Sequence, residues 1–261
     1  MKKNRLNSVW LAVVTLIFVS LACSSLQAPP LSTPTAASTS TSTSTSVPTA
    51  TALPINTLWP TETPNLAATQ VYQDFYSQVE DYQSKGYFSS TDGTYYKLDD
   101  YSQSWAQINW FQWSTIKQTV TNFVLNAHFR WSVASKTPED SGCGFLFGLQ
   151  SNKDYFAVFL DRSRIVFLQH RLALGNYAYE VGKTRGTGRV DIGGDPSEAD
   201  FSLVVNDHTV YVHVNKDFIG QYSLAQDAVT EGQLAYSMLS GTNKDYGTKC
   251  DITNVQLWEL K

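Results

Sequence analysis

Two carboxylates at alternate positions of an extended segment could perform acid–base chemistry on a saccharide, because glycoside hydrolysis uses two carboxyl groups roughly 5 to 9 Å apart. The nearest approach to that pattern is Glu198-Ala199-Asp200, which follows Pro196 and precedes an alternating segment that starts at Phe201. We interpret these acids as part of a solvated loop at a strand entrance. The sequence therefore predicts no catalytic residue.

Nucleophilic and metal-assisted chemistry have less support in the residue pattern. No Gly-x-Ser-x-Gly sequence marks a nucleophilic serine. Metal catalysis usually needs clustered ligands, and none of the histidines stands at ligand spacing from another; they are His128, His170, His208 and His213. An acidic, glycine-containing stretch could offer oxygen ligands to Ca²⁺; it holds Asp191, Asp195, Glu198 and Asp200. It matches no calcium-loop consensus, so we predict a hydrated loop, no metal and no cofactor.

Ligand binding suits the polar and aromatic residues better than catalysis does. Saccharides are held by aromatic faces and by planar polar side chains. If the apolar positions of residues 123–131 face a core, then Asn126, His128 and Arg130 project together from the opposite face. We expect a site on the strands that carry residues 126–130 and 169–179.

The same parity argument selects further candidates. Trp110 and Trp113 have opposite parity, so we expect only one of them to point outward unless a bulge intervenes. Gln169 shares a parity with Arg171, and Tyr177 shares one with Tyr179. The candidate ligand-binding residues are Trp110, Asn126, His128, Arg130, Gln169, Arg171, Tyr177 and Tyr179. The alternative is that they are only the exposed polar face of a sheet.

Short extended segments must position these residues. In residues 201–224 apolar side chains alternate with others, and Asn206-Asp207 and Asn215-Lys216 interrupt the alternation, which predicts antiparallel strands joined by tight hairpins. The outward residues of this meander, Tyr211, His213 and Asn215, carry no motif. Further strands are expected at residues 95–98, 107–113, 123–131, 144–150, 155–160, 164–171, 177–181, 233–239 and 251–260. Many short strands without helical patterns between them predict an antiparallel β-sandwich over residues 86–261.

One helix and one low-complexity segment precede the strands. Residues 64–85 carry apolar side chains at steps of three or four, between Thr63-Pro64 and Gly86, which predicts an amphipathic helix. We expect it to pack on the domain rather than form a seam with a partner. Residues 23–63 are almost all Ser, Thr, Ala and Pro, a composition typical of a disordered stalk.

The first 22 residues have the pattern of an export signal. Lys2, Lys3 and Arg5 precede an apolar run that ends at Cys23. Its last residues, Val19-Ser20-Leu21-Ala22-Cys23, resemble the bacterial lipobox, which implies cleavage before Cys23 and lipidation of that cysteine. We expect a bacterial lipoprotein whose domain is exported and lipid-anchored to the cell membrane; the alternative is an ordinary signal peptide.

Two cysteines are left once Cys23 is assigned to lipidation. An exported protein sits where disulfides persist, so an even pair, Cys143 and Cys250, fits a single bridge. Such a bridge would close a long loop and reduce the entropy of the unfolded chain. In the chain-entropy model this stabilises the fold by about 4 kcal/mol. Two unpaired buried thiols are the alternative.

The segments at residues 123–131 (FVLNAHFRW), 142–148 (GCGFLFG), 210–220 and 252–258 (ITNVQLW) follow one another in an order that resembles a known family. It is the concanavalin A-like jelly roll, in the branch with laminin-G-like and keto-disaccharide hydrolase-like domains. The resemblance implies that the last strand returns beside an early one, which would let Cys143 and Cys250 meet. The glucanase members carry a Glu-x-Asp-x-Glu strand, which this chain lacks.

Composition excludes one class of partner. Acidic residues outnumber basic ones, 23 against 19, and no basic face stands out, so we expect no nucleic-acid partner. We predict a lipid-anchored extracytoplasmic module, not an enzyme, that recognises carbohydrate through one sheet face. The alternatives are a saccharide-acting hydrolase with a site assembled from several strands, and a structural or protein-interaction module of the envelope.

Overall fold

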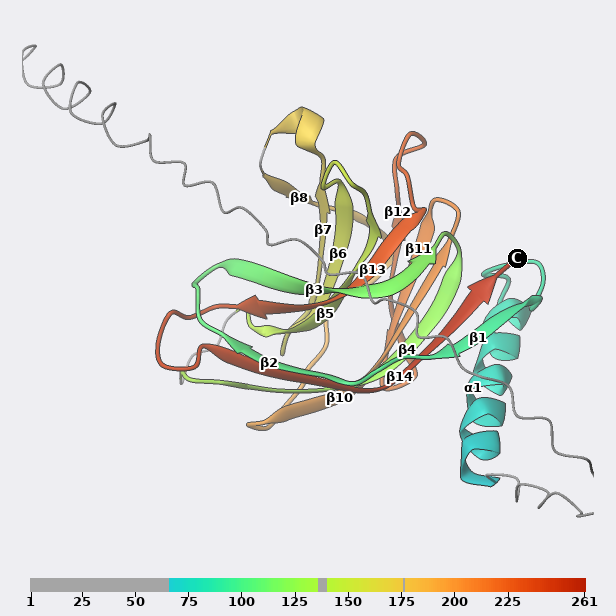
Figure 1. Cartoon of the computed structure of the whole chain (residues 1–261), viewed down its shortest axis with the longest axis horizontal. Coiled ribbons are helices and arrows are strands. Elements are labelled where there is room, and N and C mark those ends of the chain that lie inside the picture. The colour runs from blue at the N-terminus through green and yellow to red at the C-terminus, as the bar shows by residue number, and fades with distance from the viewer. Residues whose placement is uncertain (1–65, 136–139, 176) are drawn as a thin grey trace, which may run out of the picture. The chain divides into compact units, whose positions relative to one another are not determined.

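The computed structural model describes residues 66–135, 140–175 and 177–261. The expected signal peptide (1–22), Cys23 and the expected stalk (23–63) lie outside the described residues. The described part begins with the helix α1 (Leu66–Ser84), which falls within the expected range 64–85, and continues with strands in two sheets (Figure 1). In this part of the chain, no helix is long and apolar enough to cross a membrane.

The strands form an eight-stranded and a six-stranded antiparallel sheet. The eight-stranded sheet has the order β1 (Gly93–Lys97), β14 (Thr248–Leu260), β4 (Phe123–Val133), β10 (Ser197–Asn206), β11 (Thr209–Val214), β12 (Asp217–Ser223) and β9 (Lys183–Gly186), and β2 (Tyr101–Trp105) also pairs with β14. The six-stranded sheet has the order β3 (Trp110–Val120), β13 (Gly232–Ser240), β5 (Gly142–Leu149), β6 (Tyr155–Leu160), β7 (Ile165–His170) and β8 (Ala178–Glu180). The chain passes repeatedly from one sheet to the other, and the predicted all-β sandwich of the jelly-roll type is confirmed.

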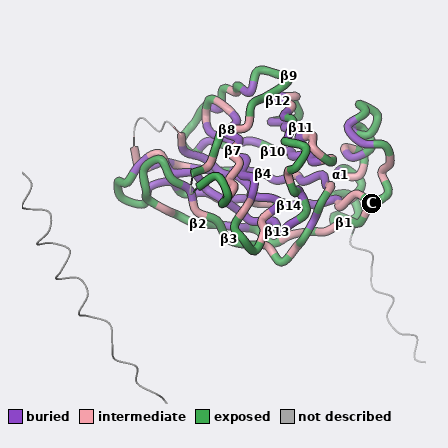
Figure 2. The backbone as a smooth tube through the Cα atoms, turned by 90° about the horizontal axis from the view of Figure 1, so that it is seen from above, coloured by how far each residue is buried: buried purple, intermediate pink, exposed green. Residues whose placement is uncertain are grey.

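The alternation of apolar residues in β4 and β10 builds the core between the sheets. Phe129 and Trp131 are buried, and the Phe129 ring stacks on Phe201 with centroids 4.7 Å apart. Phe145 from the other sheet contacts both Phe129 and Phe201. Figure 2 shows the buried residues concentrated in the central strands. The prediction that the apolar positions of residues 123–131 face the core is therefore confirmed.

The predicted disulfide is present. Cys143 on β5 and Cys250 on β14 are bonded, and both are fully buried. Because these strands belong to different sheets, the bond crosses the core and ties one sheet to the other.

The hairpin meander is confirmed, and two edge strands were missed. Asp207 and Asn215, each with a φ of 51°, make the two turns that join β10, β11 and β12. The missed strands are β2, with the sequence YSQSW, and β9, with KTRG. Both are mainly exposed and polar, so no apolar alternation marked them.

The helix packs on the outer face of the eight-stranded sheet. Its buried residues Phe75, Val79 and Tyr82 form one hydrophobic cluster with side chains of that face, Val124, Val204 and Trp258. This intramolecular packing uses the apolar side of α1, as expected. The same packing buries one residue of the meander that was predicted to point outward.

His213 was expected to point outward, and instead it is 1% exposed because α1 and the segment after it cover its strand. The ring lies 4.8 Å from that of Tyr82, and the hydroxyl of Tyr87 is 3.3 Å from its Nε2. Burial lowers the pKa of His213 to about 4, with a smaller contribution from Lys85 that Asp81 opposes.

The buried imidazole predicts a loss of stability in acid. The unfolded histidine has a pKa near 6.5, so between about pH 6.5 and 4 the unfolded chain binds a proton that the folded chain does not bind. The contribution of His213 to stability is complete above pH 6.5 and is lost as the pH falls toward 4, by up to about 3 kcal/mol. Urea unfolding of His213→Gln should lack this loss, and that of His128→Gln, in which a half-buried histidine is replaced, should keep it. Identical pH profiles in the wild type and His213→Gln would contradict this assignment.

Candidate ligand-binding groove

The outer face of the six-stranded sheet carries a second apolar layer. An outward face of a sandwich is usually polar, whereas here it holds the buried cluster Phe111, Leu146, Tyr155, Ala157, Phe159, Val166, Ala235 and Leu239. The strands beneath it are therefore apolar on both of their faces.

Small residues in the middle of this face let aromatic rings lie over the strands. Gly144 pairs with Phe159 across β5 and β6, and a Cβ at Gly144 would lie 2.2 Å from the carbonyl oxygen of Val158. Ala157 and Ala235 also have short side chains on this face. Larger rings on the same face line a hollow.

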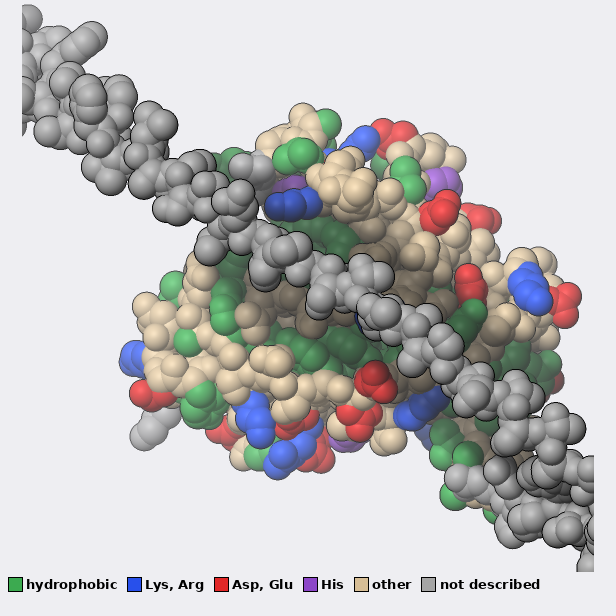
Figure 3. Space-filling view, viewed as in Figure 1, with side chains coloured by type: hydrophobic (Ala, Val, Ile, Leu, Met, Phe, Trp, Pro, Cys, Tyr) green, Lys and Arg blue, Asp and Glu red, His purple; other side chains and the backbone are tan. Residues whose placement is uncertain are grey.

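This hollow, the aromatic groove, has a volume of about 610 Å³. It is lined by Asn109, Trp110, Phe111, Trp113, Lys153, Tyr155, Leu168, His170, Leu172, Tyr177, Ala178 and Leu239. In the space-filling view, hydrophobic side chains lie recessed between β3 and β8 (Figure 3). A volume of this size falls in the range of small-molecule sites.

Aromatic rings make a continuous path along the groove. The Phe111 ring has its centroid 6.0 Å from those of Trp110 and Trp113, and Trp113 lies 5.4 Å from Tyr155. Tyr155 then stacks on His170 at 4.9 Å with the ring planes 7° apart. Trp110 and Trp113 are 51% and 39% exposed, so large apolar surfaces remain available to a ligand.

Both tryptophans line the groove, which corrects the prediction that only one would point outward. Trp113 lies on the outward parity of β3, opposite Ser237. Trp110 has the other parity, but it is the first residue of the strand and follows Asn109, whose φ is 55°. The alternation of the strand therefore does not fix the direction of the Trp110 side chain. The Trp110 ring stacks on Phe111 at the entrance of the groove.

Polar groups at the groove have defined hydrogen-bonding states. The Nδ1 of His170 lies 2.8 Å from the carbonyl oxygen of Lys153. A carbonyl only accepts, so Nδ1 carries the hydrogen and donates it. Burial raises the pKa of Tyr155 to about 12, so its hydroxyl stays protonated at neutral pH.

Gln169 and Arg171 lie in a smaller polar pocket that adjoins the groove. This pocket, of about 160 Å³, shares Tyr155 and His170 with the groove. An Nη2 of Arg171 donates to a carboxylate oxygen of Asp227 at 2.8 Å, and this hydrogen bond lowers the pKa of Asp227. The two predicted residues are thus near the groove, on its polar side.

Tyr177 and Tyr179 do not share one environment, contrary to the prediction. Tyr177 precedes β8, lines the groove and is 76% exposed. Tyr179 lies on β8 next to Ala178, so it points to the other face of the strand from that groove residue. Its hydroxyl donates to the carbonyl oxygen of Leu174 and so supports the turn that carries Leu172.

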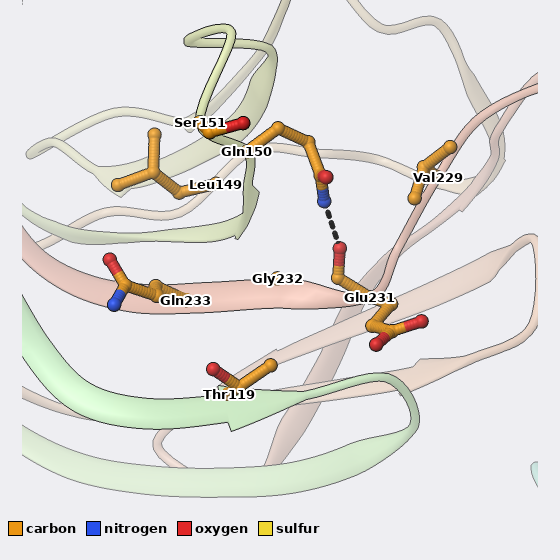
Figure 4. A pocket seen from close by; sticks show the side chains of 8 residues that line it. All are labelled: Thr119, Leu149, Gln150, Ser151, Val229, Glu231, Gly232 and Gln233. Carbon is orange, nitrogen blue, oxygen red and sulfur yellow. Dashed lines mark hydrogen bonds between the residues drawn. The ribbon is translucent and has the colours of Figure 1, made fainter.

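A further hollow of about 440 Å³ lies where β3, β5 and β13 come together (Figure 4). Gln150 and Glu231 close one side of it, because the Gln150 amide donates to the carbonyl oxygen of Glu231. Its other lining side chains, Thr119, Leu149, Ser151, Val229 and Gln233, include no aromatic ring. It lacks the stacking surface that distinguishes the aromatic groove.

The other three predicted residues lie on the eight-stranded sheet, so a single site built from residues 126–130 and 169–179 does not form. Asn126 and His128 help to line a pocket of about 200 Å³ beside α1, and the Asn126 amide donates to Gln78 of the helix. Arg130 lies farther along β4 on the same face. The prediction failed because strand parity gives the face of a residue but not its sheet.

Glu198 and Asp200 lie on β10, which corrects their interpretation as loop residues. Register places Glu198 opposite Arg130 and Asp200 opposite His128, and each pair is in contact at 2.8 Å. An ion pair of Arg130 with Glu198 and a contact of His128 with Asp200 thus account for these two polar residues of β4. The expected acidic loop therefore consists only of the part before β10, and in the described residues no group of three His, Cys, Asp or Glu side chains could hold a metal ion.

Ten of the twelve groove residues were not among the predicted site residues, and they include the rings of Phe111, Trp113, Tyr155 and His170. One signal in the sequence could have found this face. Residues 155–160 read YFAVFL and are apolar at every position, whereas a strand with one solvated face alternates. Such a strand indicates a second apolar surface outside the core.

No protein-family model and no curated protein matches the sequence. Among solved structures the chain is similar to the carbohydrate-binding module CBM66 from Bacillus subtilis, at 8% identity and a TM-score of 0.42, over 64% of this chain and 93% of that chain. It is also similar to a β-glucanase from Bacillus licheniformis, at 9% identity and 0.41, over 67% and 100% of the two chains, and to sheep galectin-11, at 12% and 0.35, over 58% and 98%. These similarities are too distant to carry an argument about a ligand or a reaction. The chain's own geometry is an antiparallel sandwich with an aromatic groove on the outer face of the six-stranded sheet.

Proposed function

We propose that the protein binds a saccharide in the aromatic groove. The observation that carries the proposal is the exposure of Trp110, Trp113 and Tyr177 around one hollow of about 610 Å³. The C–H faces of a sugar ring stack on such side chains, which lose little conformational freedom when they bind. Water is already partly displaced from the two tryptophans, because Trp110 packs on Phe111 and Trp113 packs on Phe111 and Tyr155.

The polar groups at the groove suit the hydroxyls of a sugar. The Tyr155 hydroxyl supplies a donor, and the His170 ring, whose Nδ1 donates to the carbonyl oxygen of Lys153, supplies Nε2 as a second polar atom. Lys153 and Asn109 add further polar groups at the edge. A mostly aromatic lining with a few polar groups is the usual composition of a site that recognises a small ligand.

Retention by polysaccharides tests this proposal. The full chain, purified in detergent, is run through native gels that contain plant, microbial or animal polysaccharides, and its mobility is compared with that of bovine serum albumin. At least one polysaccharide should slow the protein selectively, without release of reducing sugar. Unchanged mobility across the whole panel would overturn the proposal, and reducing-sugar release would replace it with hydrolysis.

The location proposed for the protein is the outer side of a bacterial membrane, held by lipid on Cys23. The basic residues, apolar run and cysteine at the N-terminus support it. Two or three acyl chains give durable anchoring, which one chain does not.

Replacing Cys23 should release the protein from the membrane. Because the Cys23→Ser chain has no thiol at that position to acylate, we expect it to incorporate no labelled palmitate and to leave the membrane fraction, while Ser24→Ala behaves as the wild type. Equal labelling of Cys23→Ser and the wild type would exclude this anchor.

A further inference from the structure

A second hollow lies at the edge of the sandwich where β8 and β9 approach each other. It has a volume of about 230 Å³ and is lined by Arg164, Ile165, Glu180, Val181, Gly182, Lys183, Thr187, Gly188, Arg189 and Tyr222. Three of these side chains are cationic, although the whole chain has a net charge of −4. We call this hollow the cationic pocket.

The cations of the pocket differ in how far they are neutralised. Arg164 lies 3.1 Å from a carboxylate oxygen of Asp140 and 3.9 Å from one of Glu180. In the part of the chain that the structure describes, neither Lys183 nor Arg189 forms an ion pair, and both are exposed. Their charge is therefore available to an anion in the pocket.

Because Gly188 has no side chain, a hydrogen-bond donor, the hydroxyl of Tyr222, can lie beside these charges. A Cβ on Gly188 would lie 3.2 Å from Cδ of Lys183 and 3.5 Å from the hydroxyl of Tyr222, so both side chains lie over this glycine. Burial raises the pKa of Tyr222 to about 12. Its hydroxyl consequently stays protonated and can donate to an anion.

The cationic pocket adjoins the aromatic groove. Leu168 lines the groove and Glu180 lines the pocket, and the two residues pair across β7 and β8. Paired Cα atoms in an antiparallel sheet are roughly 4.5 to 5.5 Å apart. A single polysaccharide molecule can therefore occupy both hollows.

We propose that the cationic pocket binds an anionic substituent, a carboxylate or a sulfate, of a saccharide held in the aromatic groove. The ligand class is therefore an acidic polysaccharide, and this inference rests on the proposed function of the groove. Arg189 can bind either oxyanion with two parallel hydrogen bonds, and Lys183 adds a point charge.

Matched ligands and variants test the pocket. The full chain is titrated with polygalacturonate and with its methyl ester, and in a second arm with dextran sulfate and with dextran. We expect one charged ligand to bind about tenfold more tightly than its neutral partner at low salt, and the difference to vanish in about 1 M NaCl, where charges are screened over roughly 3 Å. A preference for polygalacturonate over its ester identifies a carboxylate, and a preference for dextran sulfate over dextran identifies a sulfate.

Lys183→Ala and Arg189→Ala should each reduce the charged-to-neutral preference by about threefold or more. Arg185→Ala is the control, because Arg185 lies on β9 over the Phe218 ring, does not line the pocket, and loses the same charge. Glu180→Gln should increase the charged-to-neutral preference, because it removes the negative charge from the pocket wall.

The outcomes separate the two proposals. Equal binding of charged and neutral ligands, or an equal effect of Arg185→Ala and Lys183→Ala, would overturn the inference and leave the groove function intact. Failure of every polysaccharide to bind would overturn both.

Discussion

Replacing Trp113 with alanine is expected to weaken polysaccharide binding by about 30-fold, the effect of losing roughly 2 kcal/mol from a binding hot spot. Trp113 is central in the path of rings, between Phe111 and Tyr155, and more than a third of its surface is exposed. Its loss removes a stacking surface and widens the groove. Isothermal titration with the polysaccharide that retards the wild type gives the dissociation constants.

Tyr246→Ala is the matched control for this variant. Tyr246 is 46% exposed, but it does not line the aromatic groove, so its removal should leave the affinity unchanged. Thermal unfolding of both variants distinguishes the loss of a local contact from the loss of the folded structure. If Trp113→Ala unfolds as the wild type does and binds equally well, the groove is not the binding site.

Removing the disulfide has the largest expected effect on stability. Cys143 and Cys250 close a loop across 107 positions, and the double variant Cys143→Ala/Cys250→Ala should lose about 4 kcal/mol of the free energy of unfolding. For a domain of this size that loss lowers the melting temperature by roughly 10 °C. Differential scanning calorimetry measures both quantities.

The wild type unfolded in the presence of a reductant provides the comparison. Both cysteines are fully buried, so the reductant should act only once the chain has opened, and the reduced protein should then refold with the stability of the double variant. An unchanged melting temperature in the double variant would contradict a stabilising role for the bond.

The sequence predicted the sandwich well because burial repeats along each strand. Alternation identified β4 and the meander from β10 to β12, and turn residues with positive φ, such as Asp207 and Asn215, marked the hairpins. The edge strand β9 escaped prediction because all four of its residues are exposed. Its hydrogen bonds to β12 hold it, and backbone pairing leaves no pattern in side chains.

The site was harder to predict because it depends on which strands become neighbours. Trp110 and Tyr177 were among the predicted residues and both line the groove, yet they meet only because β3 and β8 border the same outer face. The polar face of β4 looked equally suitable in sequence. There the register places an acid opposite each of His128 and Arg130, and no residue on β4 itself records that pairing.

The bond between Cys143 and Cys250 also affects what a protease can do to this protein. The segment between the two cysteines contains β6, β7, β8 and β9, which provide much of the groove and the cationic pocket. A cut in the exposed turn at Leu172–Leu174 would open this covalent ring without dividing the molecule into two. The strands that form the aromatic groove and the cationic pocket would stay attached to the rest of the domain after such a cut.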